Sequence, residues 1–269
     1  MAHIDFETHE SHLQDLVNRF RTAQPFEYLV IDNFLCEASL QKLMAAIPEP
    51  DQKKRSSDYM FAKNKFEDPT FANGQNILMA LRDELLSDRF AAMLSVIFGK
   101  TLFVDPAFVG GGIHQGGEGS FLDMHADFSR HPANRTWLRE LNILLYLNPN
   151  YDESFGGHLE LEHAQTHQQG RVAPLLNRMV VMLTKGHTLH GYKRTNFPKG
   201  QYRTSLAAYA YSIDQDFAAE PSRSTLWKPK DASPMKAALA ALAPSLVKAK
   251  NAVLGSNTVR RAKSDTPKR

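Results

Sequence analysis

The sequence predicts a mainly β fold with flanking helices, and two observations support this prediction. From residue 101 onward, short apolar segments are separated by turn residues, which is typical of an all-β sandwich or barrel. No regular alternation of strands and helices accompanies them, so a parallel α/β sheet is disfavoured. The candidate strands cover residues 101–108, 120–125, 140–147, 158–162, 179–184 and 203–211.

The first fifty residues predict two helices on either side of one strand. Residues 10–22 place apolar side chains at helical spacing, and Pro25 ends this pattern. Residues 28–31 are apolar and β-branched and indicate a buried strand. Residues 37–47 predict a helix that Pro48 stops.

The segment before the β region is polar at first and then helical. Residues 51–75 allow two interpretations, a loop or short hairpin that acts as a lid and a solvated connector. Residues 76–98 predict two helices. Ser87 is the expected N-cap of the second helix, and Gly99 is its expected C-terminal stop.

Composition places the chain among ordinary globular proteins. Its 269 residues can bury a sizeable core, and 42% of them are hydrophobic and 23% charged. No apolar run is long enough to span a bilayer, and residues 1–7 lack the basic and apolar regions of a signal peptide. Cys36 is the only cysteine, which excludes an internal disulfide and leads us to expect a reducing, cytoplasmic location.

The most informative candidates for chemistry are His125 and Asp127, followed far downstream by His190 and Arg203. On a strand, His125 and Asp127 would point to the same face, so that one metal ion could bind both. Taken alone, these two residues are better explained as a hydrogen-bonded His–Asp pair on a sheet, and the downstream residues reverse this preference. Two imidazoles and one carboxylate, however, are the ligand set that holds non-haem Fe(II) with open positions. A basic residue beyond the second histidine suits the distal carboxylate of a co-substrate.

Six ordered segments resemble one enzyme family. Together they resemble the prolyl-hydroxylase-like branch of the Fe(II)/2-oxoglutarate-dependent dioxygenases, over roughly residues 108–212. The resemblance implies a double-stranded β-helix, the jelly-roll that cupins share, with the N-terminal helices packed outside its larger sheet. The segments cover residues 119–128, 141–148, 155–161, 174–178, 190–192 and 203–209.

The resemblance implies a ligand set for Fe(II). It assigns the metal to His125, Asp127 and His190, with O2 as a further co-substrate. His187 competes for the third position, but Gly191 follows His190 as in the family, so His190 is favoured. His187 is expected in the turn that leads to this strand.

The resemblance also implies a binding site for 2-oxoglutarate. Arg203 would bind its distal carboxylate, because a buried arginine requires a charged partner. Ser205 and Tyr146 would add hydroxyl donors, and Asn142, on the same strand face as Tyr146, would contact the other carboxylate or the substrate. Arg194 is an alternative anchor. Ascorbate is a further candidate cofactor.

The implied reaction is hydroxylation of an unactivated C–H bond, with release of succinate and CO2. The substrate would be a small molecule, a glycan precursor or a peptidyl group. Gln115 and Leu122 stand where the prolyl hydroxylases have tyrosines, which disfavours a prolyl substrate. A cupin-like metal-binding module without oxygenase activity is the alternative, although it would not require Arg203 or Tyr146.

Four large side chains follow the first two candidate ligands. Two interpretations remain open for them, the lining of the substrate mouth and a solvated basic loop. They are Arg130, Arg135, Trp137 and Arg139.

Charge divides the chain unevenly and suggests three parts. Residues 228–269 contain ten Lys and Arg against two Asp and Glu, a balance of +8, whereas the whole chain has a net charge of +3. We expect residues 1–100 to support the core, residues 101–227 to form it, and residues 228–269 to be a basic, partly disordered tail. This tail would attach weakly to an anionic partner. In a second interpretation, Leu226, Trp227 and the Ala/Leu-rich stretch from Met235 dock on the core and close the pocket.

Overall fold

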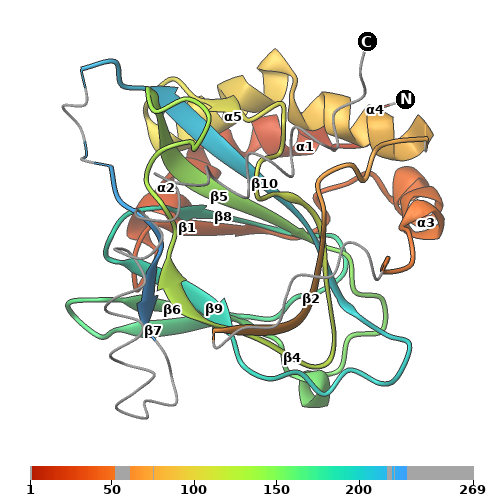
Figure 1. Ribbon diagram of the computed structural model, residues 1–269. Helices are drawn as coiled ribbons and strands as arrows, with labels where there is room; N and C mark the ends of the chain where they lie inside the picture. Colours follow the sequence, from red (N-terminus) through yellow and green to blue (C-terminus); the bar gives the residue numbers. More distant parts are fainter. Residues whose placement is uncertain (1, 52–60, 75, 217–219, 221, 229–269) are drawn as a thin grey trace.

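The structure is a computed structural model that describes residues 2–51, 61–74, 76–216, 220 and 222–228. Within these residues, one antiparallel sheet of eleven strands curls until its two halves face each other (Figure 1). This arrangement confirms the predicted mainly β, jelly-roll-like fold. The main path runs through β1 (Tyr28–Ile31), β8 (Arg178–Leu183), β5 (Trp137–Tyr146), β10 (Arg203–Ile213), β4 (Gly112–Ala126), β9 (Thr188–Tyr192), β6 (Leu159–His163) and β7 (Gln169–Val172).

Three shorter strands extend this sheet at its sides. They are β2 (Ala62–Asp68) and β11 (Leu226–Lys228), which both pair with β4, and β3 (Phe103–Val104), which pairs with β10. The segment that contains β2 was predicted to be a loop, a hairpin or a connector, and this prediction was wrong for residues 62–68. A polar strand escapes the apolar pattern on which strand prediction depends.

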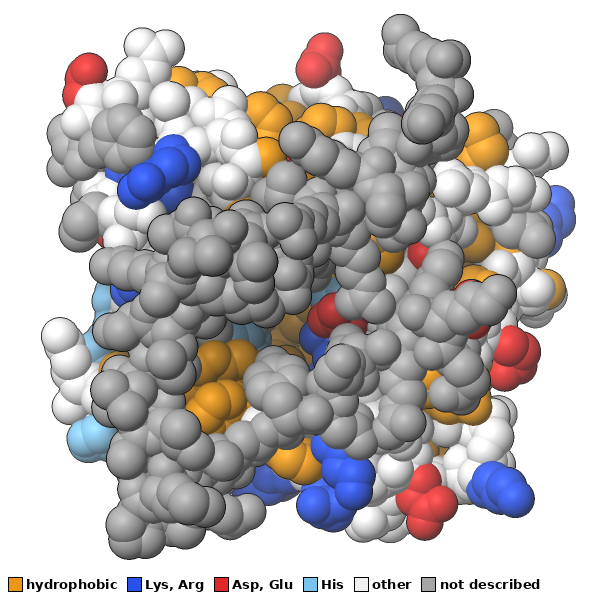
Figure 2. Space-filling view, viewed as in Figure 1, with side chains coloured by type: hydrophobic (Ala, Val, Ile, Leu, Met, Phe, Trp, Pro, Cys, Tyr) orange, Lys and Arg blue, Asp and Glu red, His pale blue; other side chains and the backbone are white. Residues whose placement is uncertain are grey.

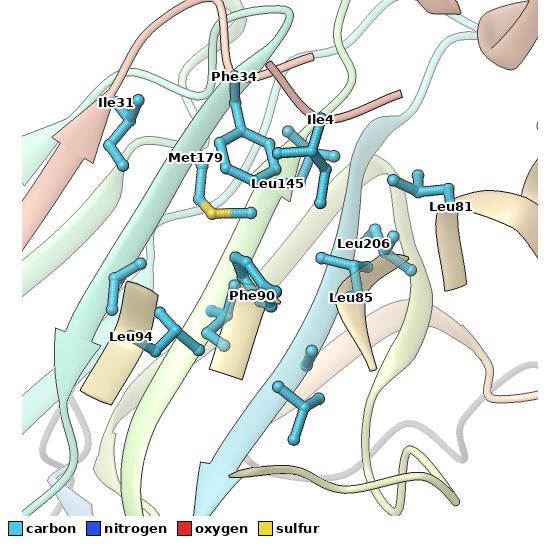
Figure 3. Packing of buried hydrophobic residues seen from close by; sticks show 14 of the residues in the cluster. Ile4, Ile31, Phe34, Leu81, Leu85, Phe90, Leu94, Leu145, Met179 and Leu206 are labelled. Atoms are coloured by element: carbon cyan, nitrogen blue, oxygen red, sulfur yellow. The ribbon is translucent and has the colours of Figure 1, made fainter. Parts of the chain in front are cut away.

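Helices cover the outer face of the half formed by β1, β8, β5 and β10 (Figure 1). Figure 3 shows Phe90 and Leu85 pointing from these helices toward Leu145, Met179 and Leu206 of the sheet. Each fully buried side chain of this kind contributes about 1.5–3 kcal/mol. The helices are α1 (Phe6–Ser11), α2 (Leu13–Thr22), α3 (Glu37–Ala46), α4 (Asn76–Leu85) and α5 (Asp88–Phe98).

The predicted helices are confirmed apart from one break. The helix expected over residues 10–22 is divided at His12 between α1 and α2. The Ser87 side chain accepts a hydrogen bond from the Phe90 amide, and Gly99 ends α5 with a left-handed φ of 86°. Both caps therefore lie where the sequence predicted them.

Strand alternation separates the helix-facing core from the interior of the curled sheet. On β5, Ile143 and Leu145 pack against the helices, whereas Asn142 and Tyr146 face the opposite way. On β10, Leu206 packs against the helices while its neighbour Ser205 lines an interior cavity. The same two strands thus build the core with one face and the candidate site with the other.

The predicted basic tail lies almost entirely outside the described residues, since residues 229–269 are not among them. None of the helices among the described residues has the length and apolar character needed to cross a membrane.

Candidate metal and co-substrate site

A cavity of about 300 Å³ opens between the two halves of the sheet. Figure 2 shows histidine, charged and apolar side chains around the hollow in the middle of this face. Strands β2, β4, β5, β9, β10 and β11 all contribute side chains to the cavity. The predicted site residues His125, Asp127, Asn142, His190, Arg203 and Ser205 line it together.

Three candidate ligands meet at the end of β4. His125 and His190 are directly paired across β4 and β9, and their ring centroids lie 4.3 Å apart. Nε2 of His125 lies 3.5 Å from Oδ1 of Asp127, and Nε2 of His190 lies 3.7 Å from Oδ2. The possible ligand atoms all fall within 4.8 Å of one another, so the trio can surround one metal ion.

Gly191 allows β9 to lie close enough to β4 for this arrangement. A Cβ atom at this position would lie 2.6 Å from the carbonyl oxygen of Leu122 and 2.9 Å from the carbonyl carbon of Asp123. Any side chain would therefore push the strands apart. The glycine after His190 is therefore needed to keep His190 beside His125.

Local hydrogen bonds and burial hold the three ligands ready for a cation. Nδ1 of His125 lies 2.9 Å from the carbonyl oxygen of Asp123 and donates its proton there. The lone pair of Nε2 is therefore directed at Asp127. Burial, and then the charge of His125, lower the pKa of His190 to about 3. Burial alone would raise the pKa of Asp127, but its contact with His125 and the charge of Arg139 hold it well below its usual range.

Arg139 lines the cavity, so the first of the two interpretations left open for it holds. Its side chain is only 1% exposed, and Nη1 lies 3.3 Å from Oδ2 of Asp127. The guanidinium carbon lies 3.8 Å and 3.7 Å from the ring centroids of Phe128 and Tyr209, and the hydroxyl of Tyr211 accepts two of its hydrogen bonds. The aromatic rings and the Asp127 carboxylate together offset the cost of burying the charge.

A bulge in β5 turns Arg139 toward the cavity. Alternation from Tyr146 and Asn142 would put residue 139 on the outer face of β5. The register with β10 shifts by one residue, from Leu141 opposite Ala210 to Arg139 opposite Tyr211. Such a bulge reverses the side-chain direction beyond it. The sequence signal for an inward-facing charge was the pair of adjacent charged residues inside an otherwise apolar strand.

Asn142 lies at the metal trio, where we had predicted a contact with the co-substrate carboxylate. Its Nδ2 donates to Oδ2 of Asp127 over 2.7 Å, and the hydroxyl of Thr184 donates to its Oδ1. With Arg139 on the same oxygen, Oδ2 is already engaged and Oδ1 remains for a metal ion.

Arg203 lies in the cavity on β10, as predicted. The residue is 7% exposed, its Nε donates to the carbonyl oxygen of Gly157 over 2.6 Å, and Nη2 donates to the hydroxyl of Tyr146 over 3.0 Å. Ser205 follows on the same face and is paired with Tyr146 across the strands. Among the described residues, no carboxylate pairs with Arg203. A buried cation without a counter-ion fits the distal carboxylate of a dicarboxylic acid.

Gly157 makes room for this arginine. It has a positive φ of 74°, and a Cβ atom there would lie 3.0 Å from Cδ of Arg203. The glycine therefore provides both the turn into β6 and the close contact with the guanidinium stem.

The two rival residues lie elsewhere. Arg194 donates to the carbonyl oxygen of Gly119 and lies over the ring of Phe121, away from the cavity. His187 lies in the turn before β9 and contacts His163, with ring centroids 4.8 Å apart. The predicted turn position of His187 is confirmed.

The solvated-loop interpretation is wrong for Arg130 as well as for Arg139. Arg130 is 4% exposed and forms an ion pair with Asp214. Trp137 packs against Phe103 rather than lining the cavity.

One part of the cavity wall is polar. Nζ of Lys65 on β2 lies 2.8 Å from Oε1 of Glu67, and their strand runs beside His114 on β4. Burial, and then the charge of Lys65, lowers the pKa of His114 to about 4. The Gly111 backbone accepts from its ring, and Nε2 is buried with no hydrogen-bond partner within the described part of the chain.

Comparisons with known proteins agree with this chemistry. Residues 111–211 match the family model of the 2OG-Fe(II) oxygenase superfamily. No curated protein matches the chain.

Solved structures share the fold at low sequence identity. A prolyl hydroxylase from Trichoplax adhaerens, in complex with a hypoxia inducible factor peptide fragment, is 16% identical; the match covers 80% of this chain and 96% of that one, with a TM-score of 0.52. A prolyl 4-hydroxylase from Pseudomonas putida is 19% identical over 74% of this chain and 98% of that one, with a TM-score of 0.51. A 2OG-Fe(II) oxygenase family oxidoreductase from Burkholderia pseudomallei is 16% identical over 75% and 91%, also with a TM-score of 0.51.

A metal-binding module without oxygenase activity would not require Arg203, a buried arginine that has no counter-ion among the described residues. The matched family model also spans the strands that carry both the ligand trio and Arg203. The family match over residues 111–211 and the shared fold therefore support a 2OG-Fe(II) oxygenase domain, with Fe(II), 2-oxoglutarate and O2 as its cofactor and co-substrates.

Proposed function

We propose that His125, Asp127 and His190 hold Fe(II) and that Arg203 binds the distal carboxylate of 2-oxoglutarate, so that the enzyme hydroxylates a C–H bond of a third molecule. The observation that carries this proposal is that Arg203, buried in the same cavity as the ligand trio, has no carboxylate partner within the part of the chain that the structure describes. Tyr146 and Ser205 add hydroxyl donors beside it.

The chain's own residues orient and shield the reacting groups. When bound, Fe(II) and its two co-substrates supply the oxidising chemistry and release succinate and CO2. Asn142 and Arg139 occupy Oδ2 of Asp127, so Oδ1 is the oxygen presented to the metal. The Asp123 carbonyl fixes the tautomer of His125. These contacts hold the ligands before the metal arrives, which reduces the reorganisation needed on binding.

The substrate end of the cavity favours a polar molecule. Lys65 and Glu67 line the cavity with an ion pair, which would bind hydroxyl or amino groups of a substrate. Gln115 and Leu122 line the cavity where prolyl hydroxylases have tyrosines, so we propose a hydroxylated or aminated small molecule, a glycan precursor or a polar peptidyl group in preference to proline.

Anaerobic reconstitution followed by exposure to O2 tests this function. We expect succinate release only when Fe(II) and 2-oxoglutarate are both present, and its suppression by a chelator. Sugars, amino sugars, amino acids and prolyl peptides are then compared for stimulation above the uncoupled rate. Absence of metal-dependent succinate from a folded, iron-loaded protein would refute the proposed function. The strongest stimulation by prolyl peptides would refute the substrate preference.

We further propose a cytoplasmic location and a separate role for the basic tail. Cys36 is the only cysteine, which suits a reducing compartment. The +8 balance of residues 228–269 supports weak attachment to an anionic partner, such as nucleic acid, anionic lipid or an acidic protein.

A truncation after Lys228 separates the tail from the active site. Trp227 lines the cavity and Lys228 forms an ion pair with Glu162, so both must remain. We expect unchanged succinate formation and lost retention on heparin or anionic vesicles at low salt, because exposed charges bind through screened electrostatics. Equal retention of the full and truncated chains would contradict the proposed role of the tail.

A further inference from the structure

We propose that Trp227 is a positioning residue that holds the ring of His125, and that residues 222–228 form a strap across the metal site. The inference rests on the proposed function, since that assigns the metal to His125 and its two partners. It adds a residue outside the segment that matches the family model, which ends at residue 211.

Stacking is the first observation. The ring centroid of Trp227 lies 4.8 Å from that of His125, with 27° between the planes. On its other face, Trp227 stacks against Phe61 at 4.9 Å and 11°. The imidazole is therefore one layer of a three-ring stack. Offset stacking of this kind contributes beyond the burial of area and fixes the tilt of each ring.

The strap is anchored on both sides of the stack. Strand β11 pairs with β4 in a register that puts Trp227 directly opposite His125. Upstream, the Arg223 amide donates to the Ser129 hydroxyl over 2.8 Å, and its guanidinium donates to the carbonyl oxygen of Asp127. Downstream, Lys228 forms an ion pair with Glu162. These contacts bind the strap to the backbone that carries two of the three candidate ligands.

The arrangement has a direct consequence for metal binding. The Asp123 carbonyl restrains Nδ1 of His125 within the ring plane, while Trp227 restrains the ring from one face. Trp227 also forms part of the cavity wall and so keeps water from that side of the site. Loss of the indole frees the imidazole to tilt and admits water, so the bound metal should be held less tightly and exchanged faster.

Fluorescence of the full chain can measure this directly, because the protein has only two tryptophans. In a Trp137→Phe background, Trp227 is the sole indole, and Co(II) is the probe. We expect Co(II) to quench its emission with a 1:1 stoichiometry. In otherwise wild-type protein, Trp227→Ala should weaken Co(II) affinity by about tenfold and accelerate Co(II) loss to a chelator, while Trp227→Phe should retain most of the affinity.

A second variant and a spectrum separate positioning from general stability. Phe61→Ala removes one layer of the stack without touching Trp227, and should shift Co(II) affinity in the same direction by a smaller factor. The ligand-field spectrum of bound Co(II) should change in Trp227→Ala and recover in Trp227→Phe. Unchanged affinity, release rate and spectrum in folded Trp227→Ala would overturn the inference, as would Co(II) binding without quenching. Failure of the wild-type chain to bind Co(II) at all would instead refute the proposed metal site.

Discussion

Replacing Asp127 or His190 by alanine is expected to abolish Fe(II)-dependent succinate formation. Each substitution removes one of three candidate ligand atoms that lie within 4.8 Å of one another. In Asp127→Ala, Arg139 also loses the carboxylate that lies 3.3 Å from its Nη1, so a buried positive charge is left beside the site. The measurement is metal content together with initial rates of succinate release, after anaerobic loading with Fe(II).

His187→Ala is the matched control for these variants. This histidine is three residues from His190 but lies in the turn before β9, where its ring contacts His163. It should retain metal and most of the activity. Full activity in His190→Ala, or loss of metal in His187→Ala alone, would show that the ligand assignment is wrong.

The sequence predicted the parts of this site that follow strand alternation. His125 and Asp127 lie on one side at the end of β4, and Arg203 and Ser205 face the same cavity from β10. Ser87 and Gly99 likewise cap α5 as predicted, because capping depends on local chemistry. These features are set within a few residues of the chain and need no knowledge of distant partners.

Features that depend on long-range pairing could not be predicted. The bulge opposite Ala210 turns Arg139 inward, and a bulge is a property of two paired strands rather than of one. Likewise, β2 and β11 become strands only because each finds an edge of β4 to pair with. Trp227 therefore joins the site from a segment whose own pattern is too short and too polar to predict a strand. Its docking was one of two interpretations that the sequence left open.

Replacing Arg203 by alanine is expected to raise the apparent KM for 2-oxoglutarate by roughly ten- to a hundredfold. A hydrogen bond to a charged group contributes about 1.5–3 kcal/mol, and each 1.4 kcal/mol corresponds to about tenfold in affinity. Metal binding should change little, because the hydrogen bonds of Arg203 are with Gly157 and Tyr146 and not with the ligand trio. Initial rates at varied 2-oxoglutarate, with metal content measured in parallel, test this.

Two variants decide whether the effect comes from the carboxylate partner or from lost packing. Tyr146→Phe keeps the buried ring but removes the hydroxyl that accepts from Arg203, so its KM should rise by a smaller factor. Arg194→Ala removes a guanidinium that lies over Phe121 and contacts Gly119, outside the cavity, and should leave the KM unchanged. A large effect in Arg194→Ala with none in Arg203→Ala would mean that the buried cation has another purpose. That result would mean that the face of β10 that carries Arg203 does not bind 2-oxoglutarate.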